Sequence, residues 1–126
     1  MTDDTIYSTI YHGTKMKKCI ILLPTQYNDG NEVATNVING ILREIDEVFD
    51  GHTIAGKVEG TYRMSDGNMI TDPSLEVWVA VEPDKIDVLK GMASRFARTL
   101  KQETIYFEVT DSEIEFIGPE PESEGV

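Results

Sequence analysis

The chain has 126 residues, of which 40% are hydrophobic and 27% charged, and these values are typical of a single globular domain. Its net charge is −12, and such an acidic surface repels the phosphates that supply most nucleic-acid affinity. The single cysteine excludes an internal disulfide and a cysteine-rich metal site.

The first sixteen residues are expected to form an N-terminal arm. Residues 5–11, "TIYSTIY", alternate and form either a short extra strand or a frayed arm. The start lacks the basic residues and apolar run of a secretory signal, and the longest apolar run, Cys19 to Pro24, is too short to cross a bilayer. We therefore expect a cytoplasmic protein with no membrane and no nucleic-acid partner.

A central strand and a helix come next. Residues 17–25 are apolar on both faces, which is typical of a strand inside a sheet. Residues 32–49 predict a helix, with Asn31 as its N-cap and Gly51 as its stop. The apolar stripe of this helix consists of Ala34, Val37, Ile38, Ile41, Ile45, Val48 and Phe49.

The chain then switches to a period of two residues. Residues 52–64 predict a strand, and 65–68, "SDGN", a turn in which Gly67 takes a positive φ. Pro73 is expected to delay the next strand to 75–81 because proline cannot donate to a ladder. In that strand the odd-numbered residues point inward and Trp78 points outward.

A second helix and a last strand complete the domain. The helix starts at Pro83 and Asp84, and its stripe consists of Ile86, Leu89, Met92, Ala93, Phe96 and Leu100. Residues 103–109 predict a strand with Tyr106 outward and Ile105, Phe107 and Val109 inward. A turn and a short added strand follow up to residue 117, and residues 118–126 predict a disordered acidic tail.

The predicted elements give the order β-α-β-β-α-β over residues 17–117. This order indicates an α+β, ferredoxin-like domain with an antiparallel sheet and both helices on one face. Its usual strand order, 4-1-3-2, places the apolar first strand in the middle of the sheet.

The sheet face away from the helices is expected to carry an apolar patch. Trp78 and Tyr106 point to that face, beside either Cys19, Ile21 and Leu23 or Ile20 and Leu22. Such patches indicate an interface or a ligand surface. We expect a second copy of the chain to cover Trp78, Tyr106 and Ile21; the alternatives are a cover formed by the chain's own termini or a small-molecule pocket.

Polar residues gather at the ends of the predicted strands. One end is expected to bring together a candidate ligand-binding group, Tyr27, Asp29, His52, Gln102 and Glu103. The other end holds Arg63, Asp66, Asp72 and Ser74, of which the first three could form a salt-bridged cap. The two histidines and the cysteine have no metal-ligand or catalytic spacing, so we predict no metal, no cofactor and no catalytic residue.

Short motifs resemble a family of small bacterial proteins known only as a domain of unknown function. They are "FDGHT", "GTYRMSDG", "DPS" and "KQETIYFEV", spread over residues 18–110. The family usually has Trp where Tyr62 stands. The resemblance implies a ferredoxin-like fold and no known activity.

Three functions are compatible with these features. The first is a non-enzymatic homodimeric module that binds a small ligand or a protein, and we favour it over an enzyme. The second is a small enzyme of the dimeric α+β barrel type, for which Tyr62 and Arg63 are the side chains suited to a pocket. The third is an acidic inhibitor that imitates nucleic acid.

Overall fold

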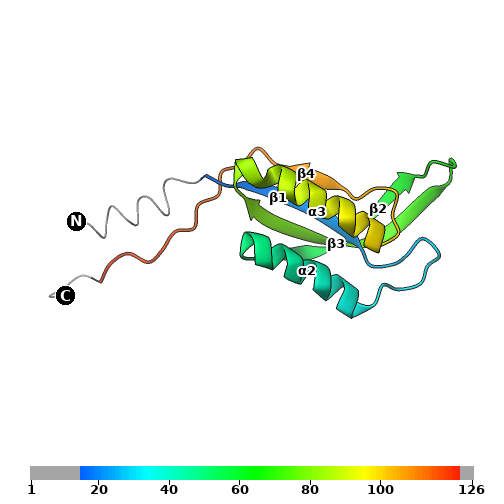
Figure 1. The fold of residues 1–126 in the computed structure, drawn as a ribbon, viewed down its shortest axis with the longest axis horizontal. Helices are drawn as coiled ribbons and strands as arrows, with labels where there is room; N and C mark the ends of the chain where they lie inside the picture. Colours follow the sequence, from blue (N-terminus) through cyan, green and yellow to red (C-terminus); the bar gives the residue numbers. More distant parts are fainter. Residues whose placement is uncertain (1–14, 123–126) are drawn as a thin grey trace.

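Strand β1 (Lys17–Pro24) lies inside a four-stranded sheet and is followed by helix α2 (Thr35–Phe49). The computed structural model describes residues 15–122. Its other elements are β2 (Thr53–Arg63), β3 (Met69–Val81), a 3₁₀ turn η1 (Pro83–Lys85), α3 (Ile86–Thr99) and β4 (Phe107–Val109). The strands are antiparallel in the order β2-β3-β1-β4, and both helices cover one face of the sheet (Figure 1). The predicted α+β class, with an antiparallel sheet and two helices, is confirmed.

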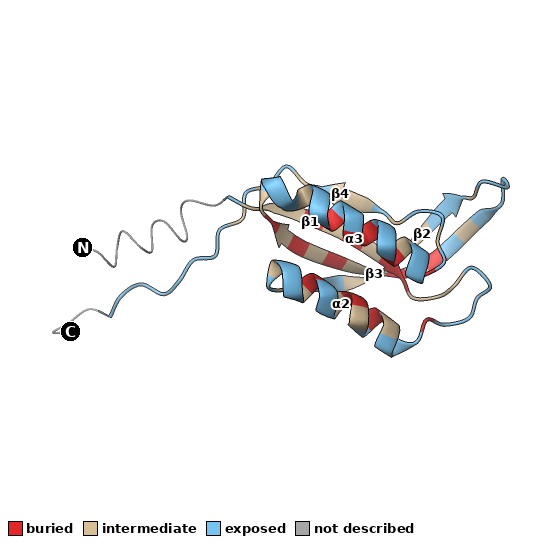
Figure 2. Cartoon of the chain, viewed as in Figure 1, coloured by how far each residue is buried: buried red, intermediate tan, exposed pale blue. Residues whose placement is uncertain are grey.

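The core lies between the helices and one face of the sheet. Alternate residues of β1 and β3 point toward the helices because side chains alternate along a strand. The buried positions of α2 and α3 face the sheet (Figure 2). The most buried members are Cys19, Ile21, Leu23, Val77, Val79, Val81, Ile45, Leu89, Phe96 and Leu100. The apolar stripes of both predicted helices and the inward residues of 75–81 contribute to this layer, whereas no residue of β2 belongs to it.

Helix α2 begins later than expected, and Asn31 is not its N-cap. The N-cap is Ala34, which makes no side-chain capping hydrogen bond. Asn31 instead belongs to a small hairpin after β1, where its carbonyl accepts from the Tyr27 N–H (2.8 Å). The backbone of residues 25–33 thus pairs with itself before the helix starts.

Strand β3 runs through Pro73, which was expected to delay it. Pro73 pairs with Glu59 of β2, and its carbonyl accepts from the Thr25 N–H on the opposite side (2.9 Å). In a strand the N and the C=O of one residue point to the same side, so the missing N–H faces Thr25, beyond the last residue of β1. Proline is tolerated there because it removes no ladder bond between β2 and β3.

The tip of the β2–β3 hairpin is a turn with the expected glycine. Gly67 has φ 91°, which confirms the turn, and its carbonyl accepts from Arg63 Nη1 (2.9 Å). Asp66 accepts from the N–H and side chain of Asn68. The expected salt-bridged cap is wrong, because Arg63 and Asp66 make these turn contacts and Asp72 is buried.

The last strand is shorter than predicted. β4 covers Phe107–Val109, although Ile105 and Phe107 pack against the core as expected. In place of an added C-terminal strand, a single bridge joins Ile114 to Met16. The possible N-terminal strand at residues 5–11 lies outside the described residues. In the described part of the chain, neither helix is long and apolar enough to span a membrane.

Candidate functional site

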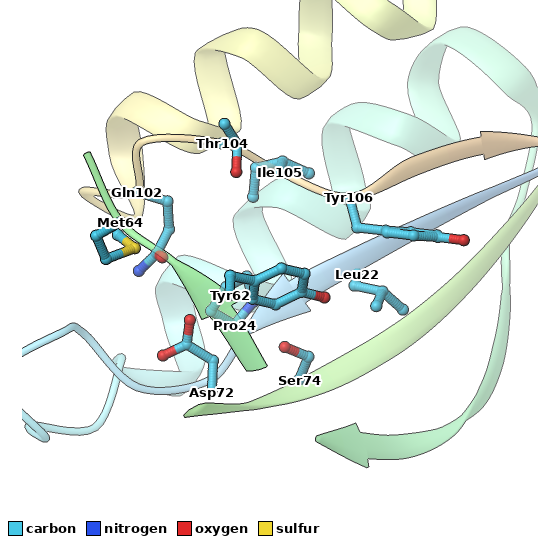
Figure 3. Close-up of a pocket in the computed structure, with 10 residues that line it drawn as sticks. All are labelled: Leu22, Pro24, Tyr62, Met64, Asp72, Ser74, Gln102, Thr104, Ile105 and Tyr106. Carbon is cyan, nitrogen blue, oxygen red and sulfur yellow. The ribbon is translucent and has the colours of Figure 1, made fainter. Parts of the chain in front are cut away.

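A pocket of about 140 Å³ opens on the sheet face away from the helices. It lies where the end of β1, the β2–β3 hairpin and the segment before β4 meet (Figure 3). These three come together because β1 and β2 run in the same direction, so both end near the loop that follows α3. The lining residues are Leu22, Pro24, Tyr62, Met64, Asp72, Ser74, Gln102, Thr104, Ile105 and Tyr106.

Asp72 places a carboxylate at this pocket. It lies opposite Gly60 of β2 and is 5% exposed. Burial raises the pKa of Asp72 above its ordinary value, because removal from water disfavours the charged form. Within residues 15–122, no side-chain hydrogen bond or salt bridge involves this carboxylate. No fully buried side-chain oxygen in residues 15–122 lacks a hydrogen-bond partner, so the Asp72 carboxylate keeps contact with solvent through the pocket. A carboxylate of low exposure without a counter-charge is the group in the pocket best suited to a cationic ligand.

Tyr62 lies over Gly60 and forms an aromatic wall. A Cβ atom on Gly60 would come within 2.5 Å of Tyr62 Cε2 and 2.6 Å of Cζ. The ring can therefore lie flat over this strand only because residue 60 is glycine. Figure 3 shows the Tyr62 ring beside the Asp72 carboxylate and the Ser74 hydroxyl, and Ser74 is itself 3% exposed.

Beyond the pocket, the open face alternates aromatic rings and carboxylates. Trp78 Nε1 donates to Glu76 (2.6 Å), and Lys18 Nζ lies 4.0 Å from the Trp78 ring centroid. Tyr106 donates its hydroxyl to Glu108 (2.7 Å); this hydrogen bond and the Glu108 charge raise the pKa of Tyr106. The face is thus acidic and aromatic, which suits the binding of a cation.

Trp78 and Tyr106 lie on the open face, as the alternation predicts. Trp78 pairs with Ile20, and Tyr106 is 45% exposed. Ile21, expected with them, was placed on the wrong face: it is fully buried and pairs with Val77 and Phe107 on the helix side. All residues of the β1 run are apolar, so the sequence does not show which of them face the helices. The pairing of β1 with β3 decides this.

The predicted ligand-binding group is divided between the two ends of the fold. Gln102 lines the pocket, and Glu103 accepts from the Ser65 N–H (3.1 Å) and Oγ (2.9 Å) at the hairpin tip. Tyr27 packs under Lys101, whose Nζ lies 5.3 Å from the ring centroid. These residues share one end because the loops after β1 and after α3 meet there.

Asp29 and His52 do not join a common site with these residues. Asp29 is exposed and accepts from Asn31 within its own loop. His52 lies just before β2, at the opposite end, and its Nδ1 is 2.6 Å from Asp46 Oδ1. The reason is strand direction. β1 and β2 are both antiparallel to β3, and Thr53 and Ile20 both pair with Trp78, so the start of β2 is level with Ile20 and not with the end of β1.

Sequence reasoning placed Asp72 and Ser74 at the opposite end from Gln102, although all three line one pocket together with Tyr62. The available signal was the alternation of Asp72, Ser74, Glu76 and Trp78 in "TDPSLEVW", which becomes visible once the strand is continued through Pro73.

No group of three or more His, Cys, Asp or Glu side chains in residues 15–122 is arranged to hold a metal ion.

The fold is similar to that of a phage SAM lyase in complex with S-methyl-5'-thioadenosine. The two chains superpose with a TM-score of 0.62 at 12% sequence identity, over 85% of this chain and 93% of the lyase. No family model and no curated protein matches the sequence. The expectation of a non-enzymatic binding module is corrected by this finding, because the similar fold is that of an enzyme.

Proposed function

We propose that this chain is a lyase that cleaves a sulfonium nucleoside of the S-adenosylmethionine class at the open-face pocket. The observation that carries the proposal is the buried carboxylate of Asp72 in an aromatic-lined pocket. The similarity of the fold to a SAM lyase with bound S-methyl-5'-thioadenosine supports the choice of substrate.

The charges of the pocket suit this substrate. A sulfonium ion is a cation with an apolar surface, and it is attracted both by carboxylates and by the faces of aromatic rings. Asp72 supplies a carboxylate and Tyr62 a ring. Burial of either charge alone is unfavourable, and bringing them together compensates part of that cost. The same residues should bind a neutral thioether more weakly.

The size of the pocket indicates how the ligand lies. At about 140 Å³, it is below the range of roughly 300–1,000 Å³ of small-molecule sites. It therefore holds the sulfonium centre and its nearest atoms. The adenine would extend over the exposed ring of Tyr106, where stacking on an aromatic side chain is favourable.

The reaction needs no added water. The carboxylate of the methionine arm attacks its own Cγ, the Cγ–S bond breaks, and both bonding electrons move to sulfur. The products are the neutral thioether S-methyl-5'-thioadenosine and a five-membered lactone that keeps its ammonium group. The protein has to hold the arm in a folded conformation and exclude water, and this positioning can supply a large part of the acceleration.

The fold fits the same proposal. We infer that the domain is of the ferredoxin-like split βαβ type, which the order of elements and strands supports. The resemblance to a bacterial family of unknown function stays a prediction. A cytoplasmic location and a homodimer stay predictions.

The test is to incubate the purified full chain with S-adenosylmethionine and to measure S-methyl-5'-thioadenosine by chromatography. Asp72→Asn should lower kcat/KM at least a hundredfold, which corresponds to about 2.7 kcal/mol. Glu59→Gln is the matched control, because Glu59 is an exposed carboxylate of the same hairpin that does not line the pocket. Absence of the thioether product from the unmodified protein, or equal rates for the two variants, would contradict the proposal.

A further inference from the structure

The β2–β3 hairpin reaches past the rest of the sheet (Figure 1). The last residue of β1, Pro24, pairs with Ser74 of β3. Beyond that point, residues 60–63 pair with residues 69–72 and with no third strand. An isolated two-stranded hairpin is only marginally stable in water. The outer part of the hairpin can therefore bend about its base beside Pro24.

This outer part forms one side of the open-face pocket, and the segment after α3 forms the other. Tyr62 comes from the hairpin and Tyr106 from the segment. The segment is fixed at both ends by backbone hydrogen bonds. The Gln102 N–H donates to the Ala97 carbonyl (2.8 Å), and the Tyr106 carbonyl accepts from the Leu22 N–H (3.2 Å). The hairpin is thus the side of the pocket that is free to move.

Glu103 joins the two sides of the pocket. Its Oε1 accepts from the Ser65 N–H (3.1 Å), and its Oε2 accepts from Ser65 Oγ (2.9 Å). Among residues 15–122, no other side-chain or loop hydrogen bond and no salt bridge connects residues 61–71 to the chain outside the hairpin. Hydrogen bonds to a carboxylate are stronger than neutral ones, but both residues are exposed and water competes for them. Such a contact can open and form again.

We propose that residues 61–71 are a hinged flap over the pocket and that Glu103 is the positioning residue that keeps this flap closed. Glu103 does not line the pocket, so it acts through Ser65 and the hairpin and not on the ligand. The closed pocket, of about 140 Å³, is small for a ligand site, which fits a flap that moves when the ligand enters or leaves. The effect on catalysis described below rests on the proposed function.

Hydrogen–deuterium exchange of the unliganded full chain tests the flap. Glu103→Ala should make the backbone amides of residues 61–71 exchange at least about tenfold faster and should leave those of β1 unchanged. Glu59→Ala is the matched control, because Glu59 is an exposed carboxylate of the same hairpin. Equal exchange in these two variants would overturn the proposal.

Substitutions at Ser65 test the same contact from the other side. Ser65→Ala should have a smaller effect on exchange than Glu103→Ala, because the backbone N–H can still donate to the carboxylate. Ser65→Thr keeps a hydroxyl group and should exchange as the unmodified protein does. An effect of Ser65→Ala in a chain that already carries Glu103→Ala would contradict a contact between the two residues, because changes to one interaction are not additive.

The kinetics of the proposed lyase reaction give a second measurement. In Glu103→Ala, the substrate must itself close the flap, so KM for S-adenosylmethionine should rise about tenfold while kcat changes less than twofold. Partial unfolding would instead lower kcat at an unchanged KM, and that result would overturn the positioning role. Absence of product from the unmodified protein would count against the proposed reaction alone, because the exchange experiment does not use it.

Discussion

The charge of Asp72 should lower the stability of the fold at neutral pH. Its folded-state pKa is raised by burial, so the folded protein holds this proton more tightly than the unfolded chain does. Stability from this group is therefore lost as pH rises from the ordinary aspartate pKa of about 3.9 through the raised value. Removing the charge should remove this loss.

We accordingly expect Asp72→Asn to raise Tm at pH 7 and to leave it nearly unchanged at pH 3, where the wild-type carboxyl is protonated in both states. Thermal unfolding followed by circular dichroism at the two pH values checks this. Glu59→Gln should show no such difference, because Glu59 is exposed. A lower Tm for Asp72→Asn at pH 7 would mean that the carboxylate has a stabilising partner.

Gly60 should control the pocket through the Tyr62 ring. In Gly60→Ala, the new methyl group would meet the ring carbons at 2.5–2.6 Å, so the ring must move. Because the ring is the end of a flexible side chain, the free energy of unfolding should change by less than about 1 kcal/mol. The rate of the proposed lyase reaction should fall at least tenfold.

The matched variant is Gly91→Ala in α3, where no atom lies within 4 Å of an added Cβ. It should keep full activity and raise the unfolding free energy by about 0.8–1 kcal/mol, the difference between Gly and Ala in a helix. Retained activity in Gly60→Ala would show that Tyr62 does not need its position over residue 60.

Single residues show where sequence reasoning reaches its limit in this molecule. The outward direction of Trp78 and the turn at Gly67 followed from alternation and from the φ that the turn requires, both of which are local. Ile21 and His52 were misplaced because their positions depend on pairing register and on strand direction, which no local pattern contains. Asp72 was missed as a pocket residue for a similar reason, since a proline conceals the strand that carries it.

Among the elements, helix α3 ends in a motif that its sequence does not favour. Lys101, the first residue after the C-cap, takes the left-handed conformation with φ 55°. The Gln102 N–H donates to the Ala97 carbonyl (2.8 Å), and these two features together are the Schellman motif. Glycine takes this conformation without strain. Lys101→Gly should therefore raise the unfolding free energy by about 0.5–1 kcal/mol. Loss of the contact between the Lys101 ammonium and the Tyr27 ring would reduce this gain.

The measurement is urea unfolding, with Arg98→Gly as the comparison. Arg98 lies in the last turn of the helix, where glycine should lower stability by about 0.5–1 kcal/mol. Equal effects of the two glycines would show that the conformation of residue 101 does not limit stability.

The two helices were predictable because their apolar stripes are long, whereas the start of α2 depends on hydrogen bonds within residues 25–33.

At the scale of the whole molecule, the order of the elements was the most predictable property. The alternation of strand and helix patterns and the apolar first strand together indicated a sheet with β1 inside and both helices on one face. The open face and its pocket required the full three-dimensional arrangement, because they join the hairpin to the loop after α3. Contacts between distant segments are also what makes such a fold unfold as one unit.

The single tryptophan allows that cooperativity to be measured, because Trp78 lies on the open face and Phe96 on the helix side, where it is 1% exposed. Phe96→Ala should lower the unfolding free energy by about 3–5 kcal/mol through loss of buried area and a residual cavity. The transition of Trp78 fluorescence should shift together with that of helical circular dichroism, although Trp78 lies on the other face of the sheet from the helices. Separate transitions by the two probes, or a loss below about 1 kcal/mol, would mean that the helix layer and the open face are not one cooperative structure.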